Sequence, residues 1–277
     1  MKKITQKLRK IFACIFIVML AMLSCGFVSK PAEKRYCDTY YTNTGITERV
    51  TVTKTFASYT VSEYYFDRCL PDYEELTQAN ACAPRAGSIV MCYYDYTCPD
   101  LIPNFMVGYY YEGVYYYRGQ SNAVEDVKEE LYDLMGTNVG GAGTTASGFL
   151  NGLSTYVTGK GYNFSYTQLS VANPITTFQP YFVLEQPIAL FISGYRFYPY
   201  LCIEQIDDNT LSFYGKNSPN GHVCVAYGHA TYNYVDANGN TTLEKFLIVS
   251  FGDGYLGLLS LDVTTVLDLA YAINVTP

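Results

Sequence analysis

The residue types in this chain most able to do covalent chemistry are cysteine and histidine, and one cysteine is distinguished by its position. Cys82 opens a stretch, 82–96, in which apolar residues recur at helical spacing, and Pro84 falls in the first turn, where proline is tolerated. The unpaired N–H groups at a helix N-terminus lower the pKa of a nearby thiol. Cys82 is therefore a candidate nucleophile, although a single cysteine at a helix start is more often inert.

A cysteine nucleophile also needs a histidine with which to exchange a proton, and the sequence contains only two. His222 follows Gly221 at the start of an expected strand, 140 residues after Cys82. His229 is seven residues further on, so in a regular strand its side chain faces the other side. These positions favour His222 as the partner of Cys82.

Arg85 places a cation one helical turn after Cys82. Three interpretations are open for it: it holds a thiolate, it binds a substrate carboxylate, or it is a solvated helix residue.

The elements that must position these residues divide into a helical part and a β-rich part. Helices are expected at 82–96, 122–135, 145–158 and 178–185, with a hairpin at 107–118. Later strands are expected at 188–192, 196–205, 210–214, 222–234 and 243–251. Helices first and antiparallel strands later predict an α+β domain of two halves, and a cleft between such halves is a natural active site.

The N-terminal segment, residues 1–26, is typical of an export signal. It carries five cations, and an apolar stretch begins at Ile11. Cleavage after Gly26, lipidation of Cys25 and retention as a membrane anchor are its three alternative fates, of which we favour the first two. The protein is thus expected to be secreted or attached to the cell surface, in contact with a membrane only through this segment or a lipid. Residues 27–70 form an expected N-terminal β-rich extension, and residues 71–277 the main domain.

Charge argues against a nucleic-acid partner. Removing residues 1–26 takes five cations and no acid from a formal net charge of −7, which leaves −12. Binding to phosphates requires a basic footprint, and no basic cluster occurs elsewhere. With two histidines and no Cys-x-x-Cys pair, the sequence also gives no sign of a metal site, and it indicates no organic cofactor.

Seven cysteines lie beyond the export segment, namely Cys37, Cys69, Cys82, Cys92, Cys98, Cys202 and Cys224. An odd number in an exported protein leaves at least one thiol unpaired. One catalytic thiol with up to three disulfides fits this count. Cys92 and Cys224 are equally well explained as small buried apolar residues.

Three motifs resemble a known family. Residues 80–88 (Asn-Ala-Cys-Ala-Pro-Arg-Ala-Gly-Ser) look like the Asn-x-Cys-Gly-Pro-Thr-Ala nucleophile motif of papain-fold cysteine peptidases, in their bacteriocin-processing-like secreted bacterial branch. Residues 221–228 (Gly-His-Val-Cys-Val-Ala-Tyr-Gly) are similar to the histidine motif of that branch, and residues 248–254 resemble more loosely its Asn-Trp-Gly-x-Gly segment. The likeness covers about residues 71–265.

This resemblance implies a papain-like fold, with Cys82 on the helical half, His222 on the antiparallel β half, and a thiol-dependent peptidase that acts on peptides or proteins. It also implies an orienting residue, for which Ser250 is the aligned candidate and Asp253 the charged alternative, and an oxyanion-stabilising glutamine, for which Gln78 is the candidate. The family pattern has Gly and Thr where this chain has Ala83 and Arg85. Two alternatives remain at this point: an inactive binding protein on the same scaffold, and an acyl transferase that uses the same site.

Overall fold

The computed structural model describes residues 49–277 except 69, 72, 74–77, 105–107, 112–113, 118–121, 142 and 263. The described residues form a mixed α+β structure, so the expected α+β class is confirmed. The helices are α3 (Cys82–Asp95), α4 (Asn122–Leu134), α5 (Ala146–Gly159) and α6 (Pro174–Val183), with short 3-10 turns η1 (Val139–Gly141) and η2 (Tyr200–Cys202).

Ten strands join in one large sheet, and a separate hairpin pairs two more. The hairpin strands are β3 (Gly108–Tyr111) and β4 (Val114–Tyr117). The sheet strands are β1 (Arg49–Thr55), β2 (Ser58–Tyr65), β5 (Asn163–Leu169), β6 (Ile188–Pro199), β7 (Ile203–Asp207), β8 (Thr210–Ser218), β9 (His222–Val235), β10 (Thr241–Ser250), β11 (Leu256–Ser260) and β12 (Val266–Thr276).

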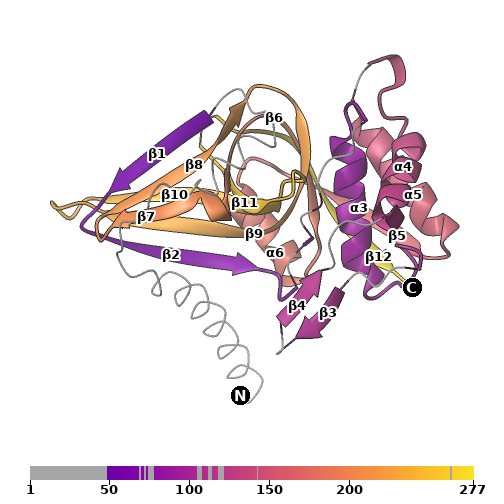
Figure 1. Ribbon diagram of the computed structural model, residues 1–277, viewed down its shortest axis with the longest axis horizontal. Coiled ribbons are helices and arrows are strands. Elements are labelled where there is room, and N and C mark those ends of the chain that lie inside the picture. The colour runs from indigo at the N-terminus through magenta and orange to yellow at the C-terminus, as the bar shows by residue number, and fades with distance from the viewer. Residues whose placement is uncertain are drawn as a thin grey trace, which may run out of the picture.

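Strand β6 is the junction of the sheet. All its pairings are antiparallel: its first half pairs with β9 and β12, and its second half with β8 and β11. Because β11 pairs with β10 and β10 with β9, the strands β6, β11, β10 and β9 form a closed circuit of pairings. Figure 1 shows this circuit in the middle of the molecule, between the long outer strands and the helices.

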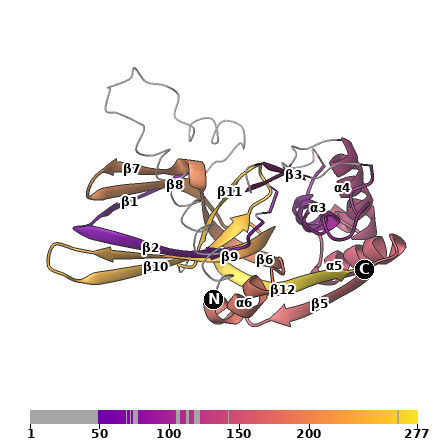
Figure 2. The same ribbon diagram turned by 90° about the horizontal axis from the view of Figure 1, so that it is seen from below.

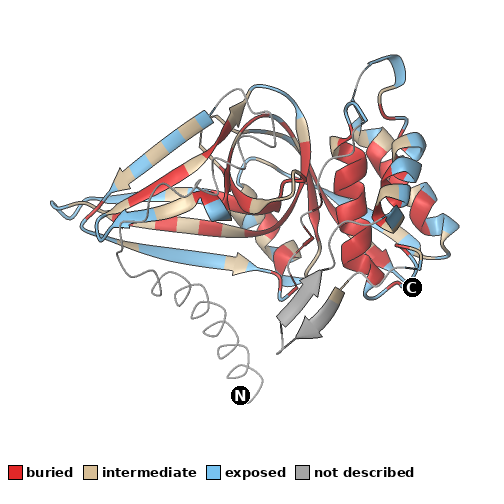
Figure 3. Cartoon of the chain, viewed as in Figure 1, coloured by how far each residue is buried: buried red, intermediate tan, exposed pale blue. Residues whose placement is uncertain are grey.

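Helix α3 is the most enclosed helix that the structure describes. Every residue from Ala83 to Asp95 is buried (Figure 3). The helix packs against α4, α5 and β9. A side chain at Gly87 would meet Met135, Leu131 and Leu153, so the helices approach closely at this position. Figure 2 shows α3 nearly end-on, with α4 beside it and the large sheet on its other side.

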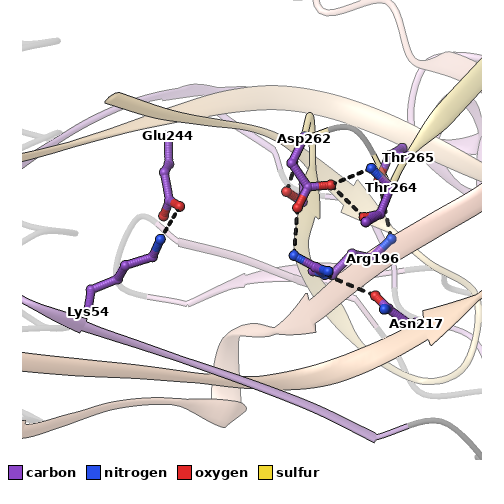
Figure 4. Close-up of polar contacts among 8 residues, drawn as sticks. Lys54, Arg196, Asn217, Glu244, Asp262, Thr264 and Thr265 are labelled. Carbon is purple, nitrogen blue, oxygen red and sulfur yellow. Dashed lines mark hydrogen bonds and ion pairs between the residues drawn. The ribbon is translucent and has the colours of Figure 1, made fainter. Parts of the chain in front are cut away.

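Polar contacts tie parts of the sheet that are distant in sequence (Figure 4). Lys54 of β1 forms an ion pair with Glu244 of β10. Arg196 of β6 bonds through Nη1 to Asp262 at 2.7 Å and through Nε to Asn217 at 2.9 Å. These side chains are partly accessible, so each pair contributes on the order of 1 kcal/mol or less.

Several expected boundaries are wrong. Helix α6 begins at Pro174, four residues before the expected start at residue 178, and the proline at its first position is itself a start signal. Strand β6 does not stop at residue 192, and the expected strand 196–205 is divided by η2. The strands β5, β11 and β12 were not predicted. The expected hairpin at 107–118 is present as β3 and β4, although its turn, residues 112–113, lies outside the described residues.

Two N-terminal predictions concern residues that are only partly described. The expected export segment, 1–26, lies outside the described residues. Within the expected extension, β1 pairs with β8 and β2 pairs with β9, so both strands join the same large sheet. In the part of the chain that the structure describes, no helix combines the length and the apolar character needed to cross a membrane.

A glycine at the crossing of β6 and β8 gives a test of this packing. A Cβ at Gly215 would lie 2.1 Å from the carbonyl oxygen of Phe197, so we expect Gly215→Ala to destabilise the protein by about 1–3 kcal/mol in urea unfolding. Gly159→Ala is the matched control, because nothing lies within 4 Å of a Cβ there. Equal stability of the two variants would contradict the observed pairing.

Candidate active site

Cys82 is the first residue of α3, as its sequence context predicts, and is partly accessible. The preceding Ala81 is fully buried and supplies no side-chain cap, and the first turn has no acidic residue. The first N–H groups of a helix have no acceptor within it, and the next residue but one, Pro84, has no N–H. The sulfur of Cys82 is therefore beside a helix N-terminus whose local charge is positive.

His222 is the first residue of β9, and its ring orientation is fixed by one hydrogen bond. Its Nε2 lies 2.9 Å from the backbone carbonyl oxygen of Phe251. A carbonyl oxygen can only accept, so Nε2 carries the hydrogen and Nδ1 is the basic atom of the neutral ring. His222 thus presents a base from a ring held by the opposite nitrogen.

Aromatic rings enclose the imidazole. The ring of Phe251 stacks on it at a centroid distance of 4.3 Å and an angle of 17°, and Tyr195 lies 5.6 Å away. Phe251 is in turn stacked on Phe197 at 4.2 Å. The imidazole therefore belongs to a stack of three rings, which limits its rotation.

The pKa of His222 lies well below its ordinary value of 6.5. Burial is the main cause, followed by the positive charge of Arg85 and more weakly that of Lys216, while the bond to the Phe251 carbonyl opposes them. Part of the residue's surface stays accessible, but the ring is covered by its aromatic neighbours. His222 is therefore neutral at pH 7.

Cys224 shows that the candidate residues come together. It lies two residues after His222, hence on the same face of β9, and is buried. Burial raises the pKa of its thiol far above the usual range, and Cys82, Arg85, Asp253 and Lys216 also act on it electrostatically. Groups of α3, β8 and the loop after β10 thus lie within electrostatic range of one buried thiol on β9; we call these residues, Cys224 and His222 the Cys224 cluster.

Arg85 is 1% exposed, so its interpretation as a solvated helix residue is wrong. Its side chain lies under the loop after β10: a Cβ at Gly252 would be 2.3 Å from the Nε of Arg85. Gly252 also has a φ of +79°, a conformation that residues with a side chain rarely adopt. A buried guanidinium in this position is out of reach of a substrate carboxylate in solvent.

The two candidate orienting residues, Ser250 and Asp253, bond to groups other than the imidazole. The buried hydroxyl of Ser250 donates to the carbonyl oxygen of Pro71 at 2.6 Å. Asp253 pairs with Lys216 at 2.6 Å, and both side chains are nearly buried. The Nε2 hydrogen of His222 is instead taken by the backbone of Phe251, which lies between them in sequence.

The oxyanion candidate Gln78 is exposed in the bend before α3, four residues ahead of Cys82. Its neighbour Asn80 is also exposed and donates through Nδ2 to the side chain of Asn138 at 2.7 Å. The hydroxyl of Tyr132 donates to the carbonyl of Ala79. The segment that leads to Cys82 is therefore tied to the end of α4.

His229 has different surroundings from His222. Its Nε2 bonds to Gln179 of α6, and its ring packs against Tyr64 and Phe182. Burial lowers its pKa as well. Its contacts with α6 separate it from the Cys224 cluster.

The five cysteines within the described residues are all thiols, namely Cys82, Cys92, Cys98, Cys202 and Cys224. Cys37 and Cys69 lie outside the described residues. The five described cysteines thus form no disulfide. Cys92 and Cys224 are buried, as their interpretation as apolar residues expects.

The pocket found within the described residues lies apart from the candidate residues. Within the described residues, no three His, Cys, Asp or Glu side chains are grouped closely enough to hold a metal ion. A pocket of about 280 Å³ lies elsewhere, between residues 171–176 and Lys245, Leu261, Thr265 and Leu267. It contains none of the residues predicted for catalysis.

Comparison of the chain with protein-family models, curated proteins and solved structures finds no significant match. Inference about function therefore depends on the residues and their geometry.

The sequence analysis missed two members of the site, Lys216 and Phe251. Lys216 had a readable signal, because it is the single charged residue of the segment that forms β8, and a buried charge needs a partner. Phe251 acts through its backbone carbonyl and its ring face, which residue type alone does not indicate.

The position of Ser250 can be tested by Ser250→Ala. The change leaves the buried Pro71 carbonyl without its donor, so we expect a loss of about 1–3 kcal/mol of unfolding free energy, with the alkylation rate of Cys82 unchanged. Ser193→Ala is the matched control, because that hydroxyl bonds at the surface to Asp268. A large fall in alkylation with full stability would instead support an orienting role for Ser250.

Acidification should destabilise the fold through its histidines. The folded-state pKa of His222 lies below 6.5, so the unfolded chain takes up the proton first, and stability is complete above about pH 6.5 and falls below it. The slope approaches about 1.4 kcal/mol per pH unit for each such histidine.

Asp95 acts in the opposite sense in the same window, because burial raises its pKa to about 6. The measurement is therefore the free energy of unfolding in urea at pH 7 and at pH 5.5, for the original protein and for His222→Gln. We expect this free energy to fall less between pH 7 and pH 5.5 in the variant than in the original protein. The same fall in both proteins would show that His222 is not held neutral.

Proposed function

We propose that this protein is a thiol-dependent hydrolase of peptide bonds, with Cys82 as nucleophile and His222 as its proton carrier, on a papain-like arrangement. The observation that supports this best is the Cys224 cluster, in which Cys82 and the face of β9 that carries His222 share one buried neighbour. A helical layer with the cysteine at a helix start, against an antiparallel sheet with the histidine, is the arrangement that the motif resemblance implies.

In the proposed reaction Nδ1 of His222 takes the proton of the Cys82 thiol, and the sulfur attacks the carbonyl carbon of a peptide bond. The C–N bond breaks as His222 delivers a proton to the leaving nitrogen, which leaves an acyl-enzyme on the sulfur. Water that gives a proton to Nδ1 of His222 then attacks the acyl carbon, the C–S bond breaks to release the acid, and Nδ1 returns the proton to the sulfur. The backbone N–H of Cys82 is the proposed donor to the oxyanion, with Gln78 as a further candidate.

The ring orientation of His222 supports its role. Nε2 is engaged by the Phe251 carbonyl, so Nδ1 is the atom that remains for the reaction. The backbone carbonyl takes the place that the family gives to an asparagine side chain. Ser250 and Asp253 are proposed as supports of this loop rather than as direct partners of the imidazole.

A catalytically inactive binding protein is the second candidate. The observations that favour it are the exposed position of Gln78 and the burial of the imidazole, which together with the charge of Arg85 lowers the pKa of His222. An acyl transferase on the same site is chemically equivalent up to the acyl-enzyme and differs in the acceptor. In each case we propose an exported protein whose partner is a peptide or protein and not a nucleic acid.

Turnover of a mixed library of fluorogenic peptides tests the proposal. We expect Cys82→Ala to abolish cleavage and His222→Gln to reduce it by about 10²–10⁴-fold, with unchanged melting temperatures. Cys92→Ala on the same helix and His229→Gln on the same strand are the matched controls and should retain cleavage.

Cleavage that survives Cys82→Ala would contradict the assignment. No cleavage by the original protein, together with slow alkylation of Cys82, would support the binding protein. A new product in which an added amine, in place of water, has accepted the acyl group would identify an acyl transferase.

A further inference from the structure

Lys216 is a buried lysine within the large sheet. Its strand, β8, lies between β1 and β6, and the residues opposite Lys216 in the register are Arg49 and Phe197. Only 7% of Lys216 is exposed, and its ammonium pairs with the carboxylate of Asp253 at 2.6 Å. Both side chains of this ion pair are nearly buried, so removal of one partner costs far more than it does for an ion pair at the surface.

Three aromatic rings lie around the ammonium of Lys216. Its Nζ is 4.5 Å from the centre of the Phe251 ring, 5.8 Å from that of Phe197 and 6.0 Å from that of Tyr195. A cation within about 6 Å of a ring centre is attracted to the ring face, and more strongly where water is excluded. Phe251 is the nearest of the three, and its ring also stacks on the imidazole of His222 at 4.3 Å. The same ring therefore lies against both the ammonium and the imidazole.

The turn after β10 carries both the partner of Lys216 and the hydrogen-bond acceptor of His222. The backbone N–H of Phe251 donates to the carbonyl oxygen of Tyr255 at 3.3 Å, which closes the turn. The glycines on either side of Asp253 have φ angles of +79° and +82°, a backbone shape that residues with a side chain rarely adopt. The carbonyl oxygen of Phe251 lies 2.9 Å from Nε2 of His222. Two residues of one tight turn therefore join the ion pair to the imidazole.

We propose that Lys216 is a positioning residue, which through Asp253 and Phe251 holds the imidazole of His222 with its hydrogen on Nε2 and its basic atom at Nδ1. This inference deepens the proposed function and rests on its choice of His222 as proton carrier. The ammonium acts on Phe251 in two ways, by its attraction to the ring and through the turn that Asp253 anchors. Without it, the turn must shift to let water reach the nearly buried carboxylate. Because Phe251 supplies both the ring face and the carbonyl, this shift moves the imidazole as well.

The test is the exchange of the imidazole hydrogens with water, measured by NMR on the nitrogen-15-labelled protein at pH 7. The chain has only two histidines, so both signals can be followed in one spectrum. We expect Lys216→Met to speed the exchange of the His222 Nε2 hydrogen about tenfold or more, because its bond to the Phe251 carbonyl opens more often. His229, whose Nε2 bonds to Gln179, is the internal control and should keep its rate.

Three further variants separate the ammonium from general damage to the fold. Lys216→Arg should restore most of the protection, because a guanidinium also pairs with a carboxylate and lies on aromatic rings. Lys54→Met is the matched control, since it removes the lysine of another ion pair in the same sheet, with Glu244, and it should leave both histidine signals unchanged. If Lys216→Met fails to fold, combining it with Asp253→Asn removes the unpaired carboxylate, and the fast exchange at His222 should remain.

The positioning role and the peptidase fail on different results. An unchanged exchange rate at His222 in a folded Lys216→Met or double variant would overturn the positioning role, as would an equal rise at His222 and His229. For a peptide that the protein cleaves, we expect Lys216→Met to lower kcat about tenfold and to change KM less than about twofold, because a buried lysine moves the base without touching the substrate. An unchanged kcat would also overturn the positioning role. Exchange that depends on Lys216 in a protein that cleaves no peptide would support the positioning role and overturn the peptidase alone.

Discussion

The complete burial of helix α3 is the constraint on which the rest of the structure depends. A helix that is covered on all sides needs a partner for each face, and α4, α5 and β9 provide them. Its close approach to α4 and α5 requires a small residue, Gly87, in the contact. Its first residue, Cys82, is partly accessible, whereas the rest of the helix is buried. Because α3 packs on β9, the cysteine that begins the helix is on an element next to the strand that carries His222.

The same burial forces polar groups into the interior. Arg85 extends from α3 to the loop after β10, and Lys216 from β8 to Asp253 on that loop. Charges in the interior are costly unless they are compensated by neighbours. Here they meet at residues 251–253, so the short loop has to satisfy packing, charge and ring orientation together. The positive φ of Gly252 is the backbone conformation that makes this close approach feasible.

Sequence reasoning succeeded where a local pattern decides the structure. The start of α3 at Cys82 and the start of β9 at His222 follow from helix and strand periodicity, and both were predicted at the correct residue.

Sequence reasoning failed where tertiary contacts decide the structure. Nothing local shows that β6 continues past Ile192, because its extension depends on pairing with β8 and β11. Ser250 and Asp253 were chosen by residue type, but the imidazole bonds to a backbone carbonyl, which every residue has. The burial of Arg85 was likewise invisible, since its neighbours come from the other end of the chain.

The pairing of β6 has a consequence for the order in which the chain matures. Every sheet partner of β6 comes after it in sequence, namely β8, β9, β11 and β12. Strand β5 likewise pairs with a later strand, β12. Contacts of such long range form late, since their loops must close first. The helices around Cys82 are synthesised well before the loop that covers Arg85 and the strand that carries His222. The surroundings of Cys82 are therefore complete only after β10 and the loop that follows it have been synthesised, well after α3 itself.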